Sequence, residues 1–270
     1  MNILVCIKQV PDTTQVRIDP VTNTLIREGV PAIVNTFDAF ALEAAARIRD
    51  KKPDTRIVVM SMGPENAKNA LKECLAIAAD KAYLVSGRAF GGSDTLATSY
   101  ILSKAIAKVE VIEGKFDAIF CGKQAIDGDT AQVGPEIAEH LDLPQITCAL
   151  EVLEADDTHM EVLKEDQDAN MVLSVKLPCL ITFTKPAWDP RFPTIKRKLA
   201  ANRAQIPTIS DADFSDDEMD KTSIGLMGSP TRVKKSFVPQ KKGGGLIVSE
   251  ETVEQSAAKL IALLSDSHVI

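Results

Sequence analysis

Short apolar runs alternate with longer segments whose apolar residues recur at helical spacing over the first two-thirds of the chain. This alternation is typical of strand–helix units around a parallel sheet. It predicts strands at 3–8, 56–62, 81–85 and 116–121, and helices at 37–51, 65–79, 93–111 and 130–141. The expected fold class is therefore α/β, with a single open parallel sheet.

Three segments depart from this alternation. Residues 17–26 form two alternating runs around a turn-rich tetrapeptide, which predicts a small hairpin. A β-rich part follows, with strands expected at 150–153, 160–163, 171–177 and 180–184 that extend or edge the sheet. After a proline-bounded loop and a short helix, residues 210–245 are polar, and an apolar stripe over 249–264 predicts a last helix. We expect an α/β domain at 1–209 and a C-terminal arm with a helix at 210–270, which packs on a partner chain.

Composition excludes several classes of protein. Hydrophobic residues make up 45% and charged residues 26% of the chain, as in ordinary folded proteins. The net charge of −7 disfavours broad binding to nucleic acid, so no nucleic-acid partner is expected. No apolar run is long enough for a membrane span, and no signal peptide is recognisable, so a cytoplasmic protein is expected. The five cysteines contain no CxxC pair, which indicates neither a disulfide framework nor a zinc site.

Candidate chemistry gathers in the loops that follow the predicted strands, because open α/β sheets bind ligands at the carboxyl ends of their strands. These loops are 6–11, 35–38, 61–64 and 122–135. Loop 122–135 combines glycines, hydroxyl and amide donors and a helix start, which favours a phosphate group. It lacks Walker A spacing, and no GxGxxG follows the first strand, so neither a P-loop nucleotidase nor a standard Rossmann dehydrogenase is supported. A capped loop without a ligand remains an alternative.

A second glycine-rich loop, 86–99, opens the third predicted helix. Two helix starts on one sheet edge suit a dinucleotide better than a mononucleotide, although a Gly-Gly-Ser-Asp cap also occurs without any ligand. Asp127 and Asp129 are suited to acid–base work or simply to capping. No nucleophile–His–acid triad is visible, so any enzymatic chemistry would come from a cofactor.

The stretch GKQAIDGDTAQVGPEIAEHL, which begins at Gly122, resembles the nucleotide-binding motif of the β subunit of electron-transfer flavoproteins. The segments ILVCIKQVPD, NTFDAFALEAA, SMGP, KLPCLITFTK and DPRFPTIKRKLAANR are also similar to that family. The similarity spans nearly the whole chain, including SPTRVKKSFVP. It implies a nucleotide-binding α/β domain of the adenine-nucleotide hydrolase-like kind. It also implies a heterodimer with a larger, FAD-binding α subunit.

The family has two branches that differ in the nucleotide held by the β subunit. In the branch that only relays electrons it is a structural AMP. In the bifurcating branch it is a second FAD, which takes hydride from NADH and sends electrons to the α-subunit flavin and to ferredoxin or flavodoxin. The segment GRAFGGSDTLATS at 87–99 resembles the bifurcating branch, so FAD is expected and AMP is the alternative. A nucleotide-sensing binding module is a further alternative.

The resemblance and the donor chemistry together give the expected site. The cofactor-binding residues are Cys6, Lys8, Asn35, Thr36, Phe37, Asp38, Met62, Asp94, Thr95, Thr98, Gly122, Lys123, Gln124, Ala125, Asp127, Gly128, Asp129, Thr130, Ala131, Gln132, Val133 and Gly134. No catalytic side chain and no metal are expected, and Arg88 and Lys8 are candidates for tuning the flavin. In the family, the stretch at 188–203 docks an acyl-CoA or lactate-type flavin dehydrogenase, which implicates Ile195, Arg191 and Lys196. The alternatives are a surface salt bridge for Arg88 and packing on its own domain for Ile195.

Overall fold

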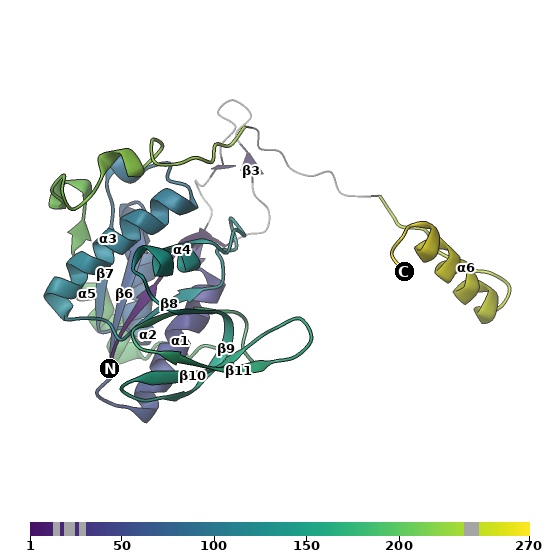
Figure 1. The fold of residues 1–270 in the computed structure, drawn as a ribbon, viewed down its shortest axis with the longest axis horizontal. Coiled ribbons are helices and arrows are strands. Elements are labelled where there is room, and N and C mark those ends of the chain that lie inside the picture. The colour runs from purple at the N-terminus through teal and green to yellow at the C-terminus, as the bar shows by residue number, and fades with distance from the viewer. Residues whose placement is uncertain (13–16, 19–24, 27–30, 235–242) are drawn as a thin grey trace. The chain divides into compact units, whose positions relative to one another are not determined.

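The computed structural model describes residues 1–12, 17–18, 25–26, 31–234 and 243–270 (Figure 1). The chain divides into two compact units. The larger unit contains residues 1–17 and 25–234, and the smaller one contains 18–24 and 235–270. Within the described ranges, no helix has both the length and the apolar character needed to cross a membrane.

The larger unit is built on a nine-stranded sheet of order β11-β10-β9-β12-β8-β1-β6-β7-β13. Every neighbouring pair from β9 to β13 is parallel, whereas β10 pairs antiparallel with both β9 and β11. The strands are β1 (Asn2–Cys6), β6 (Arg56–Met62), β7 (Lys81–Val85), β8 (Ala118–Gly122), β9 (Gln145–Ala155), β10 (His159–Lys164), β11 (Met171–Lys176), β12 (Cys179–Phe183) and β13 (Thr208–Ile209). The expected α/β class with an open, mostly parallel sheet is confirmed, and the β-rich part forms one edge of it.

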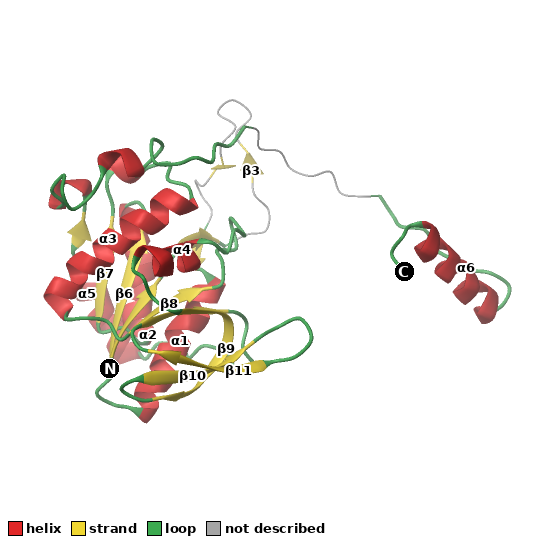
Figure 2. Cartoon of the chain, in the orientation of Figure 1, coloured by secondary structure: helices red, strands yellow, loops and turns green. Residues whose placement is uncertain are grey.

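Helices cover both faces of the sheet (Figure 2). They are α1 (Thr36–Lys51), α2 (Lys68–Ile77), α3 (Thr95–Glu113), α4 (Val133–His140) and α5 (Ile195–Arg203). Successive residues of a strand point to opposite faces, so Ile3 and Val5 enter one core with α1 and α2, whereas Leu4 enters a second core with α3 and α4. Strands buried on both faces are near-continuous apolar runs, which is why the sequence pattern identifies them.

Helix boundaries differ from the expected ones for local reasons. Residues 65–67 form a 3-10 turn after Pro64, so α2 begins only at Lys68. Asp94 is the N-cap of α3, and Gly114, with a φ of 86°, ends that helix. The helix expected at 130–141 begins at Val133, because Ala131 has a left-handed φ of 55°.

Two short strand pairs and the C-terminal region lie outside the main sheet and its helices. β2 (Gln9–Pro11) and β5 (Ala32–Val34) form a small antiparallel pair. β3 (Arg17–Ile18) and β4 (Leu25–Ile26) are the strands of the expected hairpin, whose turn lies outside the described residues. Beyond Ile209, where the compact domain was expected to end, the larger unit continues to Lys234. In the smaller unit, α6 (Val253–Asp266) is an amphipathic helix with an N-terminal capping box.

Candidate functional site

A cleft of about 640 Å³ lies at the carboxyl ends of the parallel strands. It is lined by the residues that follow β1, β6, β7 and β8, together with the starts of α3 and α4. Its volume is in the range of small-molecule and cofactor sites. The cleft therefore lies where an open α/β sheet is expected to bind its ligand.

One wall of the cleft is held together by two buried polar side chains, Asn35 and Asp38. The Asn35 amide donates to Asp38 Oδ1 at 2.9 Å and to the Gln124 carbonyl at 2.8 Å, and its own oxygen accepts from Ile126 N at 3.1 Å. Asp38 Oδ2 accepts from Lys8 N at 2.6 Å. These contacts tie the ends of β1 and β8 to the start of α1.

Gly122 allows this wall to be so compact. Its backbone N–H donates to Asp38 Oδ1 at 3.1 Å. A Cβ at this position would lie 2.7 Å from Phe37 Cβ and even closer to the Asp38 carboxylate. Only glycine permits the end of β8 and the start of α1 to approach this closely.

Burial disfavours the charged form of Asp38 and raises the pKa of its carboxyl group to about 7, although the Asn35 amide and the N–H groups of Lys8 and Gly122 oppose the shift. The carboxyl group accepts these hydrogen bonds from within the protein. Asp38 thus orders the cleft wall whatever ligand is bound.

The loop after β8 has an unusual backbone. Asp129 and Ala131 both adopt left-handed φ values, 54° and 55°, which are uncommon for residues other than glycine. Backbone of this kind turns successive N–H groups toward one side, as in anion-binding nests. The loop is also tethered to β1 by an ion pair of 2.7 Å between Lys8 Nζ and Asp127. Strained backbone of this type clusters at ligand sites.

The loop after β7 contributes the opposite wall. Residues Gly87 and 90–95 line the cleft, followed by Thr98 on α3. Asp94 caps α3 by accepting from Ala97 N at 3.1 Å. Burial works against its charge, but the N–H groups of Thr231 and Ala97 hold the pKa of Asp94 below its usual range. A stable anionic cap fixes the start of this helix beside the cleft.

The structure brings most of the sequence-predicted site residues together. Lining the cleft are Cys6, Lys8, Asn35, Asp38, Met62, Asp94, Thr95, Thr98, Gly122, Lys123, Gln124, Ala125, Gly128, Thr130, Ala131, Gln132, Val133 and Gly134. Five others are not among the lining residues: Thr36, Phe37, Arg88, Asp127 and Asp129. Asp127 and Asp129 instead brace the loop, through Lys8 and through Gln124 Nε2 at 2.7 Å.

Further lining residues were not among the predicted ones. They are Ile7, Gly63, Pro64, Val85, Ser86, Gly87, Phe90, Gly91, Gly92, Ser93, Leu102 and Cys121. Nine of these twelve residues lie in loops 6–11, 61–64 and 86–99, which the sequence pattern indicates as candidate ligand loops. Leu102, one turn further along α3 than Thr98, had no such signal.

Comparison with known proteins identifies the family. Residues 22–214 match the description "Electron transfer flavoprotein domain". Over 97% of its length, the chain is 48% identical to the electron transfer flavoprotein subunit beta of Megasphaera elsdenii, of which 98% is covered. The chain belongs to the electron transfer flavoprotein β-subunit family.

This β-subunit family member is also similar to two other proteins over nearly its full length. It is 46% identical to the caffeyl-CoA reductase-Etf complex subunit CarD of Acetobacterium woodii, with both chains fully covered. It is 43% identical to protein FixA of Rhizobium leguminosarum bv. phaseoli, over 97% of this chain and 94% of FixA. Family membership brings with it a role in electron transfer, association with a flavin or nucleotide, and pairing with an α subunit.

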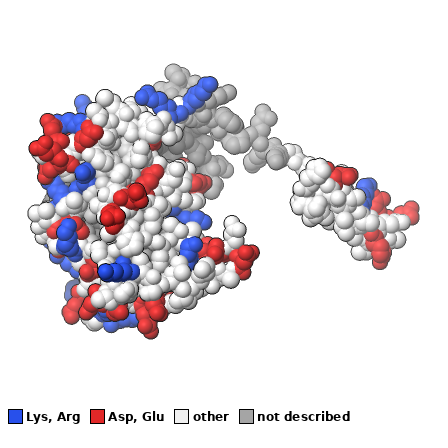
Figure 3. All heavy atoms as spheres, viewed as in Figure 1, with Lys and Arg blue, Asp and Glu red and all other residues white. Residues whose placement is uncertain are grey.

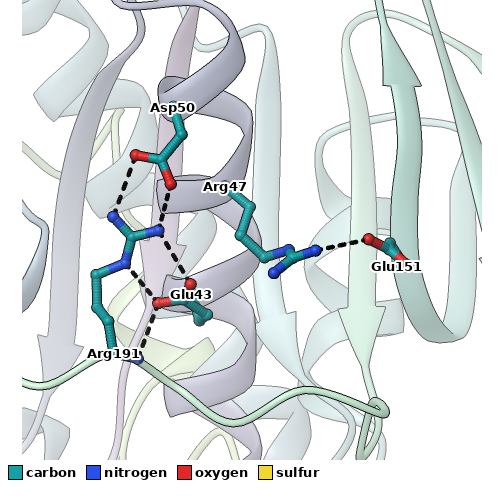
Figure 4. A network of polar contacts seen from close by, with 5 residues as sticks. All are labelled: Glu43, Arg47, Asp50, Glu151 and Arg191. Atoms are coloured by element: carbon teal, nitrogen blue, oxygen red, sulfur yellow. Dashed lines mark hydrogen bonds and ion pairs between the residues drawn. The ribbon is translucent and has the colours of Figure 1, made fainter.

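In this β-subunit family member, residues 188–203, named the docking loop for the role proposed below, run from Trp188, which contacts Phe40 of α1, into α5, which packs on α2. Arg191 donates from Nε and Nη2 to the buried Glu43 at 2.8 and 3.0 Å, and it also reaches Asp50 at 2.6 Å (Figure 4). Arg47, beside this network, pairs with Glu151 at 3.0 Å. Arg191 thus directs its donors into its own domain.

The helix of the docking loop is fixed on its inner side and exposes both apolar and charged side chains on its outer side. Arg197 Nη2 donates to the carbonyls of Leu75 and Ala79 at 3.0 and 2.7 Å, at the C-terminal end of α2. Ile195 is 82% exposed, and Phe192 and Leu199 are also exposed. Ile195 therefore does not pack this helix onto its own domain. Lys196 lies next to it and is exposed as well.

Proposed function

We propose that this chain is the β subunit of a bifurcating electron transfer flavoprotein that binds FAD in the cleft. In this role the complex oxidises NADH and delivers electrons to the α-subunit FAD and to ferredoxin or flavodoxin. The observation that carries the proposal is that two glycine-bearing loops and two helix N-termini line one cleft. A site that takes only AMP needs one such loop, whereas a dinucleotide uses both.

The donors in the cleft suit the phosphates of a dinucleotide. No side chain caps α4 at Gln132, so the first N–H groups of that helix are available to an anion. Across the cleft, α3 begins beside the hydroxyl groups of Thr95 and Thr98. We assign the adenosine end to Asn35, Asp38 and loop 122–134, and the diphosphate to Asp94, Thr95 and Thr98 with their neighbouring N–H groups.

Flavin, when bound, supplies the hydride and single-electron chemistry, and the chain binds and orients it. Lys8 remains a candidate for tuning the flavin, because it lines the cleft while paired with Asp127; Lys123 lines the cleft as well. Arg88 is exposed and does not line the cleft, so it is a weaker candidate for tuning the flavin.

We propose that the docking loop receives a flavin dehydrogenase of the acyl-CoA or lactate type. Ile195 would provide the apolar anchor, and Lys196 the charged rim that speeds encounter. Arg191 would fix the loop to α1 through Glu43 and Asp50. The relative named as a subunit of a caffeyl-CoA reductase complex supports the acyl-CoA class.

The exposed apolar residues of α6, among them Val253, Leu260 and Ile261, fit a helix that packs on another chain. We propose the α subunit as that chain, with residues 210–270 as the contributing part. All five cysteines are free, which suits a reducing compartment such as the cytoplasm. Acidic and basic side chains are interspersed on the face of the larger unit seen in Figure 3, which suits protein partners better than nucleic acid.

The decisive measurement is the nucleotide content of the heterodimer. The chain is co-expressed with its α subunit, the ligands are extracted, and FAD and AMP are quantified per complex. Two FAD per heterodimer support bifurcation. One FAD with one AMP would mean simple electron relay, and a complex without flavin would overturn the proposal altogether.

A double variant assigns the second FAD to this cleft. Thr95→Leu with Thr98→Leu places bulky apolar groups where the diphosphate is proposed. We expect one FAD per complex in place of two, with AMP able to replace the lost dinucleotide and with the α/β domain still folded. Unchanged FAD content would place the cofactor elsewhere.

A further inference from the structure

Residues 224–231, called the clasp below, contact the loop after β7. None of them lines the cleft. Ile224 is buried in the core that includes α3, together with Phe214 and Met219 from the same polar stretch. The clasp is therefore part of the larger unit, and beyond it the chain continues through residues 232–234 toward the smaller unit.

Two glycines bring the clasp and the loop into close contact. Gly92 has a φ of 77°, and a Cβ there would lie 2.6 Å from Leu226 Cδ2. Gly225 has a φ of 59°, and a Cβ there would overlap the Ala89 carbonyl oxygen. Both positions have left-handed backbone that favours glycine, and at Gly225 the obstacle is a backbone carbonyl that cannot move aside, whereas at Gly92 it is the end of the exposed Leu226 side chain.

Hydrogen bonds join the clasp to Asp94, the N-cap of α3. The backbone N–H of Asp94 donates to Ser229 Oγ at 2.9 Å, and the Ser229 hydroxyl donates to the Gly225 carbonyl at 2.6 Å. Thr231 N donates to Asp94 Oδ2 at 2.9 Å, while Asp94 Oδ1 caps the helix at Ala97 N. Asp94 thus uses one carboxylate oxygen for α3 and the other for the clasp.

We propose that the clasp is a positioning element that sets the start of α3 for the diphosphate of FAD and links cofactor binding to the order of the C-terminal arm. Ser229 and Thr231 touch no ligand in this role and act through Asp94. Binding of a diphosphate to the start of α3 stabilises the Asp94 conformation that the clasp requires. By reciprocity, an ordered clasp strengthens binding of the diphosphate.

The inference rests on the proposed FAD site and predicts a specific difference between ligands. AMP is proposed to bind at the adenosine end, formed by Asn35, Asp38 and loop 122–134, and to lack the second phosphate that reaches the start of α3, so its affinity should be independent of the clasp. Loss of one clasp hydrogen bond should raise the dissociation constant for FAD about tenfold, the equivalent of about 1.4 kcal/mol. The dissociation constant for AMP should change by less than about twofold. A general loss of folding would weaken both ligands alike.

The test compares Ser229→Ala with Ser223→Ala in the full-length chain paired with its α subunit. Ser223 is a matched control, because its hydroxyl bonds to Asp220 within the same stretch and does not contact the loop. Dissociation constants for FAD and AMP are measured with the deflavinated complex. Exchange of the backbone amide hydrogens of residues 224–231 is followed by mass spectrometry with and without FAD.

We expect FAD to slow this exchange in the parent and in Ser223→Ala but not in Ser229→Ala. A second variant, Thr231→Pro, removes the backbone donor to Asp94 and should behave like Ser229→Ala. If the parent binds FAD in the cleft and both clasp variants keep the affinity for FAD and the slowing of this exchange by FAD, the clasp proposal is wrong. If the parent holds no FAD in this subunit, the proposed function fails first.

Discussion

The guanidinium group of Arg191 forms a bidentate ion pair with the buried carboxylate of Glu43. Nε donates to Oε2 at 2.8 Å and Nη2 donates to Oε1 at 3.0 Å. The backbone N–H of Arg191 also donates to Glu43, at 3.1 Å. Glu43 lies in the middle of α1. The docking loop is therefore fixed to the same helix whose N-terminal start forms one wall of the cleft. A buried carboxylate in this position needs its cation, because an unpaired buried charge is costly.

Glu43→Gln should therefore weaken the attachment of the docking loop. The amide presents an N–H group to a guanidinium that has only donors, and we expect a loss of about 2 kcal/mol in the free energy of unfolding. Chemical denaturation measures this loss. Electron delivery to the partner dehydrogenase should also fall, because the loop is no longer held in its docking conformation.

Asp157→Asn provides the control for Glu43→Gln. This carboxylate is 98% exposed and pairs with Lys52 at 3.5 Å. Its neutralisation should change the unfolding free energy by less than about 0.5 kcal/mol. Equal losses in the two variants would show that the Glu43 contact has no special role.

Ile195→Ala separates docking from folding. Because Ile195 is 82% exposed, its truncation should leave the melting temperature unchanged. We expect NADH to reduce the flavin as fast as in the parent, while transfer to the dehydrogenase falls at least tenfold, as for the loss of a central apolar anchor. Val111→Ala on α3, where the side chain is 87% exposed, is the control and should affect neither rate. A parallel decline of both rates in Ile195→Ala would contradict docking.

The sequence predicted the sheet and the cleft because both depend on local pattern. Strands such as β6 and β7 are continuous apolar runs, and the cleft residues follow at their ends. The clasp could not be predicted in this way. Its one core residue, Ile224, lies in the short run Ile-Gly-Leu-Met, and Phe214 and Met219 before it are isolated apolar residues, so only their contacts with distant elements reveal a packed segment.

The role of individual cleft residues was also beyond the sequence. Asn35 and Asp38 have the residue types of ligand contacts, yet their hydrogen bonds join three chain segments to one another. Asp129 and Ala131 adopt left-handed backbone without glycine, which no local rule indicates. Tertiary contacts decide each of these features.

Gly122→Ala tests the close approach of β8 and α1. The added methyl group would collide with Phe37 and Asp38, so we expect a loss of about 1–3 kcal/mol in unfolding free energy and a reduced nucleotide content. Gly128→Ala lies in the same loop with no atom within 4 Å of the new Cβ. This control should keep its stability, and it is a control for stability alone because Gly128 itself lines the cleft. Full stability and nucleotide content in Gly122→Ala would mean that the wall is not tightly packed.

Asp38 gives the chain a pH dependence whose sign follows from its pKa. Burial raises the pKa from the ordinary aspartate value of 3.8 to about 7 in the folded chain, so between these values the folded state binds a proton that the unfolded state has lost. The stability contributed by protonated Asp38 is complete below about pH 3.8, declines as the pH rises, and is lost once the pH passes about 7.

Two measurements check this sign. The Asp38 side-chain carbon, followed by NMR in the nucleotide-free chain, should titrate with a midpoint near 7. The unfolding free energy should fall between pH 5 and 7 in the parent and fall less in Asp38→Asn, which lacks the titrating group. Asp38→Asn should be less stable at every pH, because one of its N–H groups faces the backbone donors of Lys8 or Gly122. A midpoint below 4 would show that these donors outweigh burial, and the parent would then gain stability with rising pH.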